Sequence, residues 1–268
     1  MLKLTITGCT GRMGRLLLRE INQSPDVELA GALTRTGNPF IGQDVGNLIE
    51  TCALNIFITD DPKIAFKEAD VIIDFSAPEA LDRYLDEALH QKKPFAVCQS
   101  SPSEVQKEKL QTASQSIPLL MAPNTSLAVA LLRKLSLLTA KVLGTSYDIS
   151  ILEMHHHHKK DAPSGAALSI AKDLATLEHL KHNIPPYPSL SPRPNDHLEC
   201  VSIRGGSVVG DHTVIFASEK DMITLEHRAL DRALFAEGAI KAAQWLSDKP
   251  KGLYTIDDVV EVSLCQPS

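Results

Sequence analysis

The sequence predicts an α/β fold: a Rossmann-like, doubly wound parallel sheet followed by a second, α+β domain. Strand and helix patterns alternate over the first half of the 268 residues, and crossovers of helical length join parallel strands. A glycine-rich turn separates the first strand from the first helix, as in folds that bind nucleotides. After Pro123-Asn124-Thr125 the alternation stops, and a long helical run precedes several β-rich runs.

The strands expected in the first domain are short, apolar and rich in β-branched residues. They cover Leu2–Thr7, Val27–Leu33, Asn55–Ile58, Val71–Phe75, Phe95–Val97 and Leu119–Met121. Helices are expected over Arg12–Asn22, Pro62–Glu68 and Ser103–Gln115. The segment Ser76-Ala77-Pro78-Glu79 has the pattern of a capping box, in which Ser76 accepts from the first turn and Glu79 reaches back.

The second domain is expected to begin with a long helix and to contain a mixed or largely antiparallel sheet. The helices predicted after Thr125 are Leu127–Val142, a segment starting at Ser164, and Asp231–Trp245, the last of which closes the chain. The predicted strands are Tyr147–Met154, Cys200–Arg204, His212–Ser218 and Ile223–Arg228. Between them, Ile184–Pro194 has five prolines in eleven residues and is expected to be an irregular loop.

The composition excludes several classes of function. A formal net charge of −6 argues against nucleic acid as a partner. No uninterrupted apolar run approaches the eighteen residues of a membrane span, and the N-terminus lacks the pattern of a signal peptide. The five scattered cysteines form no C-x-x-C pair, which is typical of a reducing compartment. We therefore expect a cytoplasmic protein with a small-molecule ligand.

The glycine-rich turn is Gly8-Cys9-Thr10-Gly11-Arg12-Met13-Gly14, between the first strand and the first helix. Glycines there let the backbone approach a pyrophosphate, and the helix start offers N–H groups and a positive dipole. The spacing is G-x-x-G-x-x-G and not the commoner G-x-G-x-x-G. The alternative is a βα turn that binds nothing.

The end of the second strand indicates which dinucleotide is preferred. NAD-specific domains place an acid about twenty residues after the glycines, against the ribose 2′-hydroxyl. Leu33-Thr34-Arg35-Thr36 has no carboxylate there and one arginine. A charged hydrogen bond from Arg35 to a 2′-phosphate is worth roughly 1.5–3 kcal/mol, so we expect NADPH to be preferred, with NADH possible. The alternative is a surface arginine without a contact.

Four consecutive histidines, His155 to His158, follow the strand expected at Tyr147–Met154. They fit a metal site, a purification tag, a solvated loop or acid–base chemistry. A tag normally lies at a terminus. Adjacent residues of an extended segment alternate faces and cannot all reach one ion, so we expect no functional metal.

The residues around the histidines decide between these interpretations. The pattern E-x-H-H-x-x-K-x-D-A-P-S-G over Glu153–Gly165 resembles the substrate motif of the 4-hydroxy-tetrahydrodipicolinate reductase family. The resemblance extends over nearly the whole chain, through G-x-x-G-R-M-G at the start, Arg204-Gly-Gly, Val209–His212 and Glu226–Ala229. It implies a two-domain, usually tetrameric enzyme that reduces a cyclic imine dicarboxylate to tetrahydrodipicolinate with NADH or NADPH, in lysine and diaminopimelate synthesis.

The resemblance also implies roles for individual residues. His155 is the expected proton donor or acceptor and Lys159 the second proton donor. The expected substrate-binding residues are His156, Ser164, Gly165 and Ala166, with capping of the next helix as the alternative role of Ser164. The expected cofactor-binding residues are Gly8, Cys9, Thr10, Gly11, Arg12, Met13, Thr34, Arg35, Cys98, Gln99, Ser100, Ala122, Pro123, Asn124 and Thr125. The dinucleotide-binding domain would comprise residues 1–126 and 235–268, and the substrate-binding and oligomerisation domain residues 127–234.

Two positions depart from the family pattern. Cys98-Gln99-Ser100-Ser101 stands where the family typically has Gly-Thr-Thr-Gly, which adds a side chain where backbone approaches the cofactor. Ala166 stands where threonine is usual, so one hydroxyl donor to a substrate carboxylate is missing. Two other functions stay open at this point: an aspartate dehydrogenase-like enzyme, and a non-catalytic NADPH-sensing protein.

Overall fold

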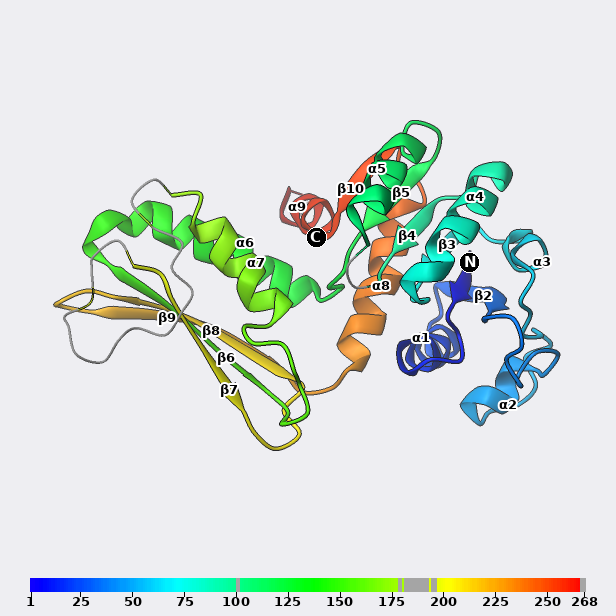
Figure 1. Ribbon diagram of the computed structural model, residues 1–268, viewed down its shortest axis with the longest axis horizontal. Coiled ribbons are helices and arrows are strands. Elements are labelled where there is room, and N and C mark those ends of the chain that lie inside the picture. The colour runs from blue at the N-terminus through cyan, green and yellow to red at the C-terminus, as the bar shows by residue number, and fades with distance from the viewer. Residues whose placement is uncertain (100–101, 178–179, 181–192, 194–196, 266–268) are drawn as a thin grey trace. The chain divides into compact units, whose positions relative to one another are not determined.

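The computed structural model describes residues 1–99, 102–177, 180, 193 and 197–265. The chain divides into two compact units, one formed by residues 1–126 and 233–268 and the other by residues 127–232 (Figure 1). The proline-rich segment Ile184–Pro194 lies, apart from Arg193, outside the described residues.

The first unit contains a six-stranded sheet in which all neighbouring strands are parallel. Its order is β10-β5-β4-β3-β1-β2. The strands are β1 (Leu2–Thr7), β2 (Val27–Leu33), β3 (Val71–Asp74), β4 (Phe95–Val97), β5 (Pro118–Met121) and β10 (Gly252–Thr255). The predicted parallel, Rossmann-like sheet is confirmed, and the last part of the chain supplies its edge strand β10.

Helices cover both faces of this sheet. The helices of one face are α3 (Pro62–Phe66), α4 (Leu81–Gln91) and α5 (Glu104–Ala113). The helices α1 (Arg12–Gln23) and α8 (Ala233–Leu246) contact each other and form a second layer. Because β1 pairs with β2 on one side and with β3 on the other, the strand order reverses at β1. In open α/β sheets, ligands bind beside the carboxyl ends of the strands at this point.

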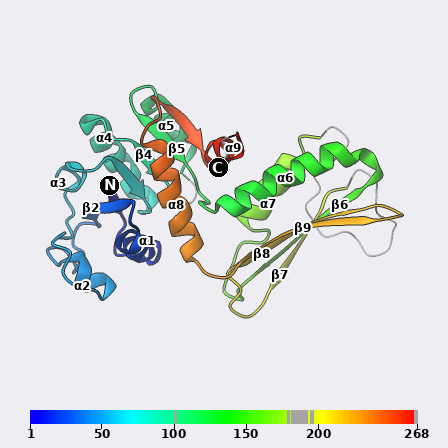
Figure 2. The ribbon, with the colours of Figure 1, turned by 180° about the vertical axis from the view of Figure 1, so that it is seen from behind.

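The second unit contains a four-stranded mixed sheet, as the sequence predicts, and its strand order is β7-β6-β8-β9. The strands are β6 (Asp148–His155), β7 (Glu199–Arg204), β8 (Gly210–Ala217) and β9 (Met222–Ala229). The pair β6–β7 is parallel and the other pairs are antiparallel. The helices α6 (Leu127–Leu143) and α7 (Gly165–Leu174) cover one face, where alternate strand residues such as Ile149, Ile151, Val214 and Phe216 are buried (Figure 2).

Two local predictions are wrong. Asn55–Ile58 is not a strand, because Asn55 has a positive φ of 59° and the segment makes only an isolated bridge, at Phe57. Ser76 does not form a capping box, because its N–H donates to Oδ1 of Asp74 and its hydroxyl to the carbonyl of Ala77. A capping box occurs instead at the start of α5, between Ser103 and Gln106.

Several elements of the structure are absent from the sequence prediction: the short helix α2 (Val45–Ile49), the strand β10 and the helix α9 (Ile256–Cys265). Cys9, Cys52, Cys98 and Cys200 all have free thiols. Within the described part of the chain, no helix has both the length and the apolar character that a membrane span requires.

Candidate active site

The glycine loop lies at the reversal of strand order. Gly8 has a φ of +68°, and a Cβ there would stand 2.5 Å from the carbonyl oxygen of Phe75, directly after β3. A Cβ on Gly14 would stand 2.3 Å from the carbonyl oxygen of Gly8. The first and third glycines are therefore required by the packing of the loop itself.

The middle glycine serves a different purpose. Gly11 is exposed, and a Cβ there would meet only the carbonyl oxygen of Gly8, at 3.2 Å. Gly11 is also the N-cap of α1 and offers no side chain to the first turn. The first N–H groups of a helix lack carbonyl partners within it, so this turn suits a pyrophosphate.

The side chains next to the loop connect it to the end of β2. The hydroxyls of Thr10 and Thr34 lie 2.9 Å apart, and the side-chain amide of Asn38 donates to Thr10 Oγ1 at 3.2 Å. Arg35, one residue further, is exposed, as a contact to a bound 2′-phosphate requires. Cys9 is fully buried, which raises the pKa of its thiol to about 12, so the thiol is not accessible at the surface of the loop.

Of the other residues around the loop, Arg12 is exposed and Met13 is half-buried. The remaining predicted cofactor residues follow β4 and β5. Cys98 is buried, its N–H donates to the carbonyl of Asp74 at 2.9 Å, and burial raises the pKa of its thiol. Gln99 is also buried, whereas Ser100 lies outside the described residues.

The segment after β5 is held by hydrogen bonds within the first unit. The N–H of Ala122 donates to the carbonyl of Val97 at 2.9 Å. Thr125 Oγ1 donates to the carbonyl of Phe235 at 2.6 Å, and Oδ1 of Asn124 accepts from the N–H of Ser126 at 2.9 Å. Pro123 is exposed between them. The predicted cofactor-binding residues that the structure describes thus follow the carboxyl ends of β1, β2, β4 and β5, which meet at one edge of the parallel sheet.

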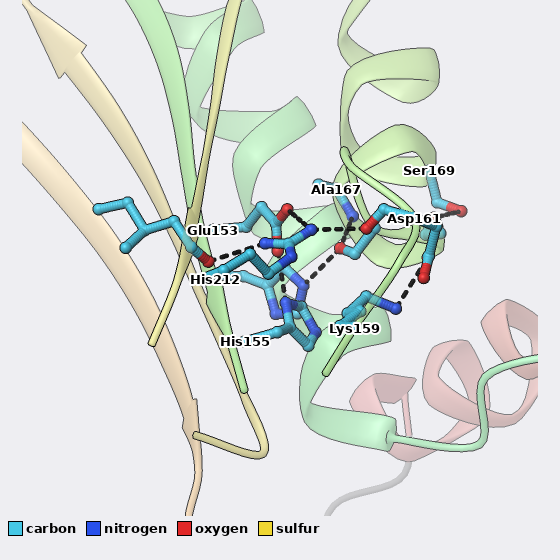
Figure 3. Close-up of polar contacts among 11 residues, drawn as sticks. Glu153, His155, Lys159, Asp161, Ala167, Ser169 and His212 are labelled. Atoms are coloured by element: carbon cyan, nitrogen blue, oxygen red, sulfur yellow. Dashed lines mark hydrogen bonds and ion pairs between the residues drawn. The ribbon is translucent and has the colours of Figure 1, made fainter. Parts of the chain in front are cut away.

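A buried acid–base pair lies in the second unit. His155 is the last residue of β6, and its Nδ1 is hydrogen bonded to Oε2 of Glu153 (Figure 3). Residues two apart on a strand share a face, which places both side chains on the face that α6 and α7 cover. Oε1 of Glu153 accepts from Nη2 of Arg204 at 2.8 Å. Glu153 is fully buried and His155 is 8% exposed.

The surroundings determine the charge of this pair. Burial alone would raise the pKa of Glu153, but hydrogen bonds from Arg204, Ser202 and His155 lower it, so the carboxylate is ionised. Burial lowers the pKa of His155, partly opposed by the charge of Glu153. A neutral imidazole that donates from Nδ1 to a carboxylate has an unprotonated Nε2. His155 is therefore prepared to exchange a proton at Nε2.

The loop after β6 holds Lys159. Its Nζ lies 2.8 Å from Oδ2 of Asp161, and the carbonyl of Asp161 accepts from Nη2 of Arg204 at 2.6 Å. Arg204 thus connects the loop with Lys159 to the Glu153–His155 pair. Figure 3 shows the side chains of Lys159 and His155 on neighbouring parts of this unit.

The other histidines of the run differ among themselves. His156 is half-buried, and burial, followed by the charge of Arg232, lowers its pKa. His157 and His158 are exposed, with ring centroids 3.8 Å apart, and His157 Nδ1 lies 2.9 Å from the carbonyl oxygen of Gly206. His157 and His158 are therefore surface residues and not part of the buried acid–base pair.

The start of α7 lies close to the acid–base pair. Ser164 is the N-cap, and its Oγ accepts from the N–H of Ala167 at 3.2 Å. The same Oγ lies 3.2 Å from Nε2 of His212. The hydroxyl is thus engaged within the protein, while the N–H groups of Gly165 and Ala166 have no carbonyl partner inside the helix. These two N–H groups suit a carboxylate.

Three side chains of this site have no role in the sequence prediction: Glu153, Arg204 and His212. The strand register pairs Glu153 with His212 and His155 with Arg204. The rings of His155 and His212 meet edge to face, with centroids 5.3 Å apart, and burial lowers the pKa of His212 to about 4. The sequence signal for Glu153 was the alternation of residues along β6. Position 153 continues the buried positions of Ile149 and Ile151, so a carboxylate there faces the interior.

Glu153, His155 and His212 also have the donor set of a transition-metal site, with ligand atoms within 4.8 Å of one another. Arg204 already provides positive charge 2.8 Å from Glu153, and Ser164 occupies the Nε2 side of His212. The arrangement therefore favours proton transfer over metal binding.

Comparison with known proteins decides the family. The family model described as dihydrodipicolinate reductase, N-terminus, matches residues 2–125, and the C-terminus model matches residues 128–260. The chain belongs to the dihydrodipicolinate reductase family. Two relatives named 4-hydroxy-tetrahydrodipicolinate reductase are each 39% identical to this chain. The match to the relative from Pseudoalteromonas atlantica covers 96% of this chain and 98% of the relative. The match to the relative from Anaplasma marginale covers 97% of this chain and 99% of the relative.

Solved structures share the fold of this dihydrodipicolinate reductase family member. A dipicolinate-bound dihydrodipicolinate reductase from Paenisporosarcina sp. TG-14 has a TM-score of 0.76 at 19% identity, covering 95% of this chain and 97% of its own. An amine dehydrogenase from Mycobacterium smegmatis has a TM-score of 0.66 at 12% identity, covering 96% and 95%. At such identities the likeness concerns the fold alone.

Proposed function

We propose that this dihydrodipicolinate reductase family member reduces 4-hydroxy-tetrahydrodipicolinate to tetrahydrodipicolinate with a nicotinamide dinucleotide, in lysine and diaminopimelate biosynthesis. The observation that supports this most directly is the buried Glu153–His155 pair, which Arg204 connects to the loop bearing Lys159. The glycine loop in the first unit supports a dinucleotide. Family membership and the relatives of that name supply the reaction.

The dinucleotide, when bound, would supply a hydride to the unsaturated ring of the substrate. The product lacks the 4-hydroxyl of the substrate, so the complete reaction takes up one hydride and one proton and releases that hydroxyl as water. The added electron density must be matched by a proton, which calls for a proton donor near the accepting atom. Lys159 has the donor group, and Asp161 restrains it at 2.8 Å. His155 exchanges a proton at Nε2, and the carboxylate of Glu153 stabilises the imidazolium while it exists.

The substrate is a dicarboxylate, and the second unit has groups that complement it. Lys159 offers positive charge, and His156 offers a ring N–H. The first-turn N–H groups of Gly165 and Ala166 point out of the start of α7, where the helix dipole favours an anion. We assign substrate binding to these residues, and give Ser164 the indirect role of shaping the turn through its bonds to Ala167 and His212.

We further propose that NADPH is preferred over NADH. Arg35 is exposed directly after β2, and no carboxylate occurs at Leu33–Thr36 to repel a 2′-phosphate. The comparison of kcat/KM for the two cofactors tests this preference. We expect a ratio of about 10 to 100 in favour of NADPH, and a ratio near one in the wild-type enzyme would refute the assignment of Arg35.

We also propose a homotetramer, and support for it comes from the face of the second sheet opposite α6 and α7, on which no helix of the described residues lies. The strand residues that point away from α6 and α7 include Val201 and Ile203, which are 38% and 42% exposed. Leu152 and Met154 lie beside them on β6 and are only partly buried. A contiguous apolar surface on a sheet marks a protein interface. Light scattering coupled to size-exclusion chromatography tests the assembly, and a monomer at micromolar concentration would contradict it.

The reaction itself is tested with wild-type enzyme and substrate generated by the preceding synthase. We expect NADPH oxidation that depends on the synthase, and tetrahydrodipicolinate identified by mass spectrometry. The same assay with oxaloacetate and ammonia tests the aspartate dehydrogenase-like alternative. Turnover of oxaloacetate without turnover of the synthase product would overturn the proposal, and nucleotide binding without either turnover would favour a sensor.

A further inference from the structure

The side chain of Gln99 is buried without a hydrogen-bond partner. It is 5% exposed, and neither Nε2 nor Oε1 has a partner within the described part of the chain. Buried side-chain polar atoms are nearly always paired, because an unpaired one loses the hydrogen bonds that it would make to water. A primary amide with both its donor and its acceptor unpaired therefore indicates a group that a ligand completes.

The place of Gln99 in the sheet indicates which part of a ligand this is. Gln99 comes two residues after β4, and β4 lies beside β3. The end of β3 in turn contacts the glycine loop, because Gly8 packs on Phe75. A dinucleotide crosses the sheet at the reversal of strand order, with its pyrophosphate at the glycine loop. The exposed Arg35 after β2 places the adenosine half on the β2 side, so the β4 side receives the nicotinamide half.

The neighbouring polar groups are less suited to a neutral polar ligand. The hydroxyl of Thr7 and the N–H of Ser76 both donate to Oδ1 of Asp74, and burial raises the pKa of this carboxyl. The Cys98 thiol contacts the carbonyl of Ala96 at 3.8 Å. Gln99 alone among these four described side chains, Thr7, Asp74, Cys98 and Gln99, has an unused donor together with an unused acceptor.

We propose that the side-chain amide of Gln99 binds the carboxamide of the nicotinamide ring. Nε2 donates to the carboxamide oxygen, and Oε1 accepts from the carboxamide NH₂, which pairs two groups of identical hydrogen-bonding capacity. This contact fixes the rotation of the ring, and hence which face delivers the hydride. The inference rests on the proposed function in two respects: a nicotinamide dinucleotide binds the first unit, and its adenosine half lies on the side of Arg35.

Binding measurements without turnover test this assignment. Isothermal titration calorimetry would compare NADH, reduced 3-acetylpyridine adenine dinucleotide, in which methyl replaces the NH₂, and ADP-ribose, which lacks the ring. The variants are Gln99→Met, which keeps the volume, Gln99→Ala, and Gln111→Ala as the control on the exposed surface of α5. We expect Gln99→Met to weaken the binding of NADH about 5- to 30-fold. It should weaken the binding of the acetyl analogue less and leave the affinity for ADP-ribose unchanged.

The stability of the ligand-free variant separates ligand binding from a structural role. Because methionine removes two unpaired buried polar atoms, we expect the Tm of ligand-free Gln99→Met to equal or exceed that of wild type. A lower Tm of Gln99→Met together with equally weakened binding of NADH and ADP-ribose would overturn the assignment. Unchanged NADH affinity in both Gln99 variants would overturn it as well. If the wild-type protein bound neither NADH nor ADP-ribose, both the proposed cofactor and this inference would fail. If the Gln99 variants bound ADP-ribose normally and NADH with unaltered affinity, only the assignment of Gln99 would be rejected.

Discussion

The Nδ1 atom of His155 is hydrogen bonded to Oε2 of Glu153, which lies two residues earlier on the same face of β6. The other carboxylate oxygen of Glu153 accepts from Arg204 on the neighbouring strand β7. The carboxylate therefore orients the ring of His155 and also raises its pKa against the lowering effect of burial. We therefore propose that Glu153 positions the ring nitrogen of His155 that we assign to proton exchange.

The variant Glu153→Gln tests this relationship. Loss of the negative charge should lower the pKa of His155 further, because Glu153 is the group that raises it. An NMR titration of His155 measures this shift without turnover, and we expect kcat to fall at least about tenfold. Glu219→Gln, at an exposed position, is the control. An unchanged or higher His155 pKa in Glu153→Gln would contradict the account.

His212 predicts a pH dependence of stability. Its pKa is about 4 in the folded protein and close to 6.5 in the unfolded chain, so the unfolded state takes up the proton first as the pH falls. The contribution of the neutral His212 to the free energy of unfolding is fully present above pH 6.5 and is lost as the pH falls from 6.5 to 4. The difference between the folded and unfolded pKa of His212 corresponds to about 3 kcal/mol of unfolding free energy.

The variant His212→Gln isolates this contribution. Urea unfolding at pH 7 and at pH 4.5 should show a smaller loss of unfolding free energy in the variant than in wild type. The charged groups that act on His212 are His155, Glu153, His227 and Lys159, and the groups that titrate elsewhere in the protein cause the pH dependence that remains in the variant. Equal losses in the two proteins would show that His212 titrates normally in the folded state.

Two glycines of the same loop should respond differently to alanine. Gly14→Ala places a Cβ 2.3 Å from the carbonyl oxygen of Gly8, so we expect it to lower the unfolding free energy by about 1–3 kcal/mol. Gly11→Ala meets that oxygen only at 3.2 Å and should leave stability nearly unchanged while weakening NADPH binding. Thermal unfolding and fluorescence titration of the two variants measure both effects, and equal destabilisation would refute the distinction.

Ala166 gives a prediction of increased affinity. The family usually has a threonine after Ser-Gly, and Ala166 lies in the first turn of α7, where a hydroxyl could donate to a substrate carboxylate. A neutral hydrogen bond contributes about 1 kcal/mol, so Ala166→Thr should lower KM about fivefold. An equal or higher KM in steady-state assays would show that this position does not face the substrate.

The parts of the fold set by local sequence could be predicted. The glycine loop, the strand Leu2–Thr7 and the N-cap at Ser164 depend on neighbouring residues and on periodicity. The capping box expected at Ser76 does not form because Asp74, which also accepts from Thr7 on another strand, takes its N–H. Such competition depends on the pairing of β1 with β3, which no local pattern contains.

In the candidate site, too, the residues of one local motif could be predicted, whereas those brought in by strand pairing could not. His155 and Lys159 could be named because one continuous motif contains both. Arg204 and His212 join them only after β7 and β8 pair with β6, about 50 residues along the chain from Glu153. Their role depends on the register of three strands. The alternation of buried residues along β6 was the only local sign that position 153 faces inward.

The most direct test of the central claim is kcat for NADPH-dependent reduction of the synthase product in His155→Ala and Lys159→Ala. We expect a loss of about 100-fold or more in each variant. His157→Ala and Lys160→Ala, at exposed neighbouring positions, are expected to keep the wild-type kcat. Wild-type kcat in both His155→Ala and Lys159→Ala would contradict the assignment of proton transfer to this site.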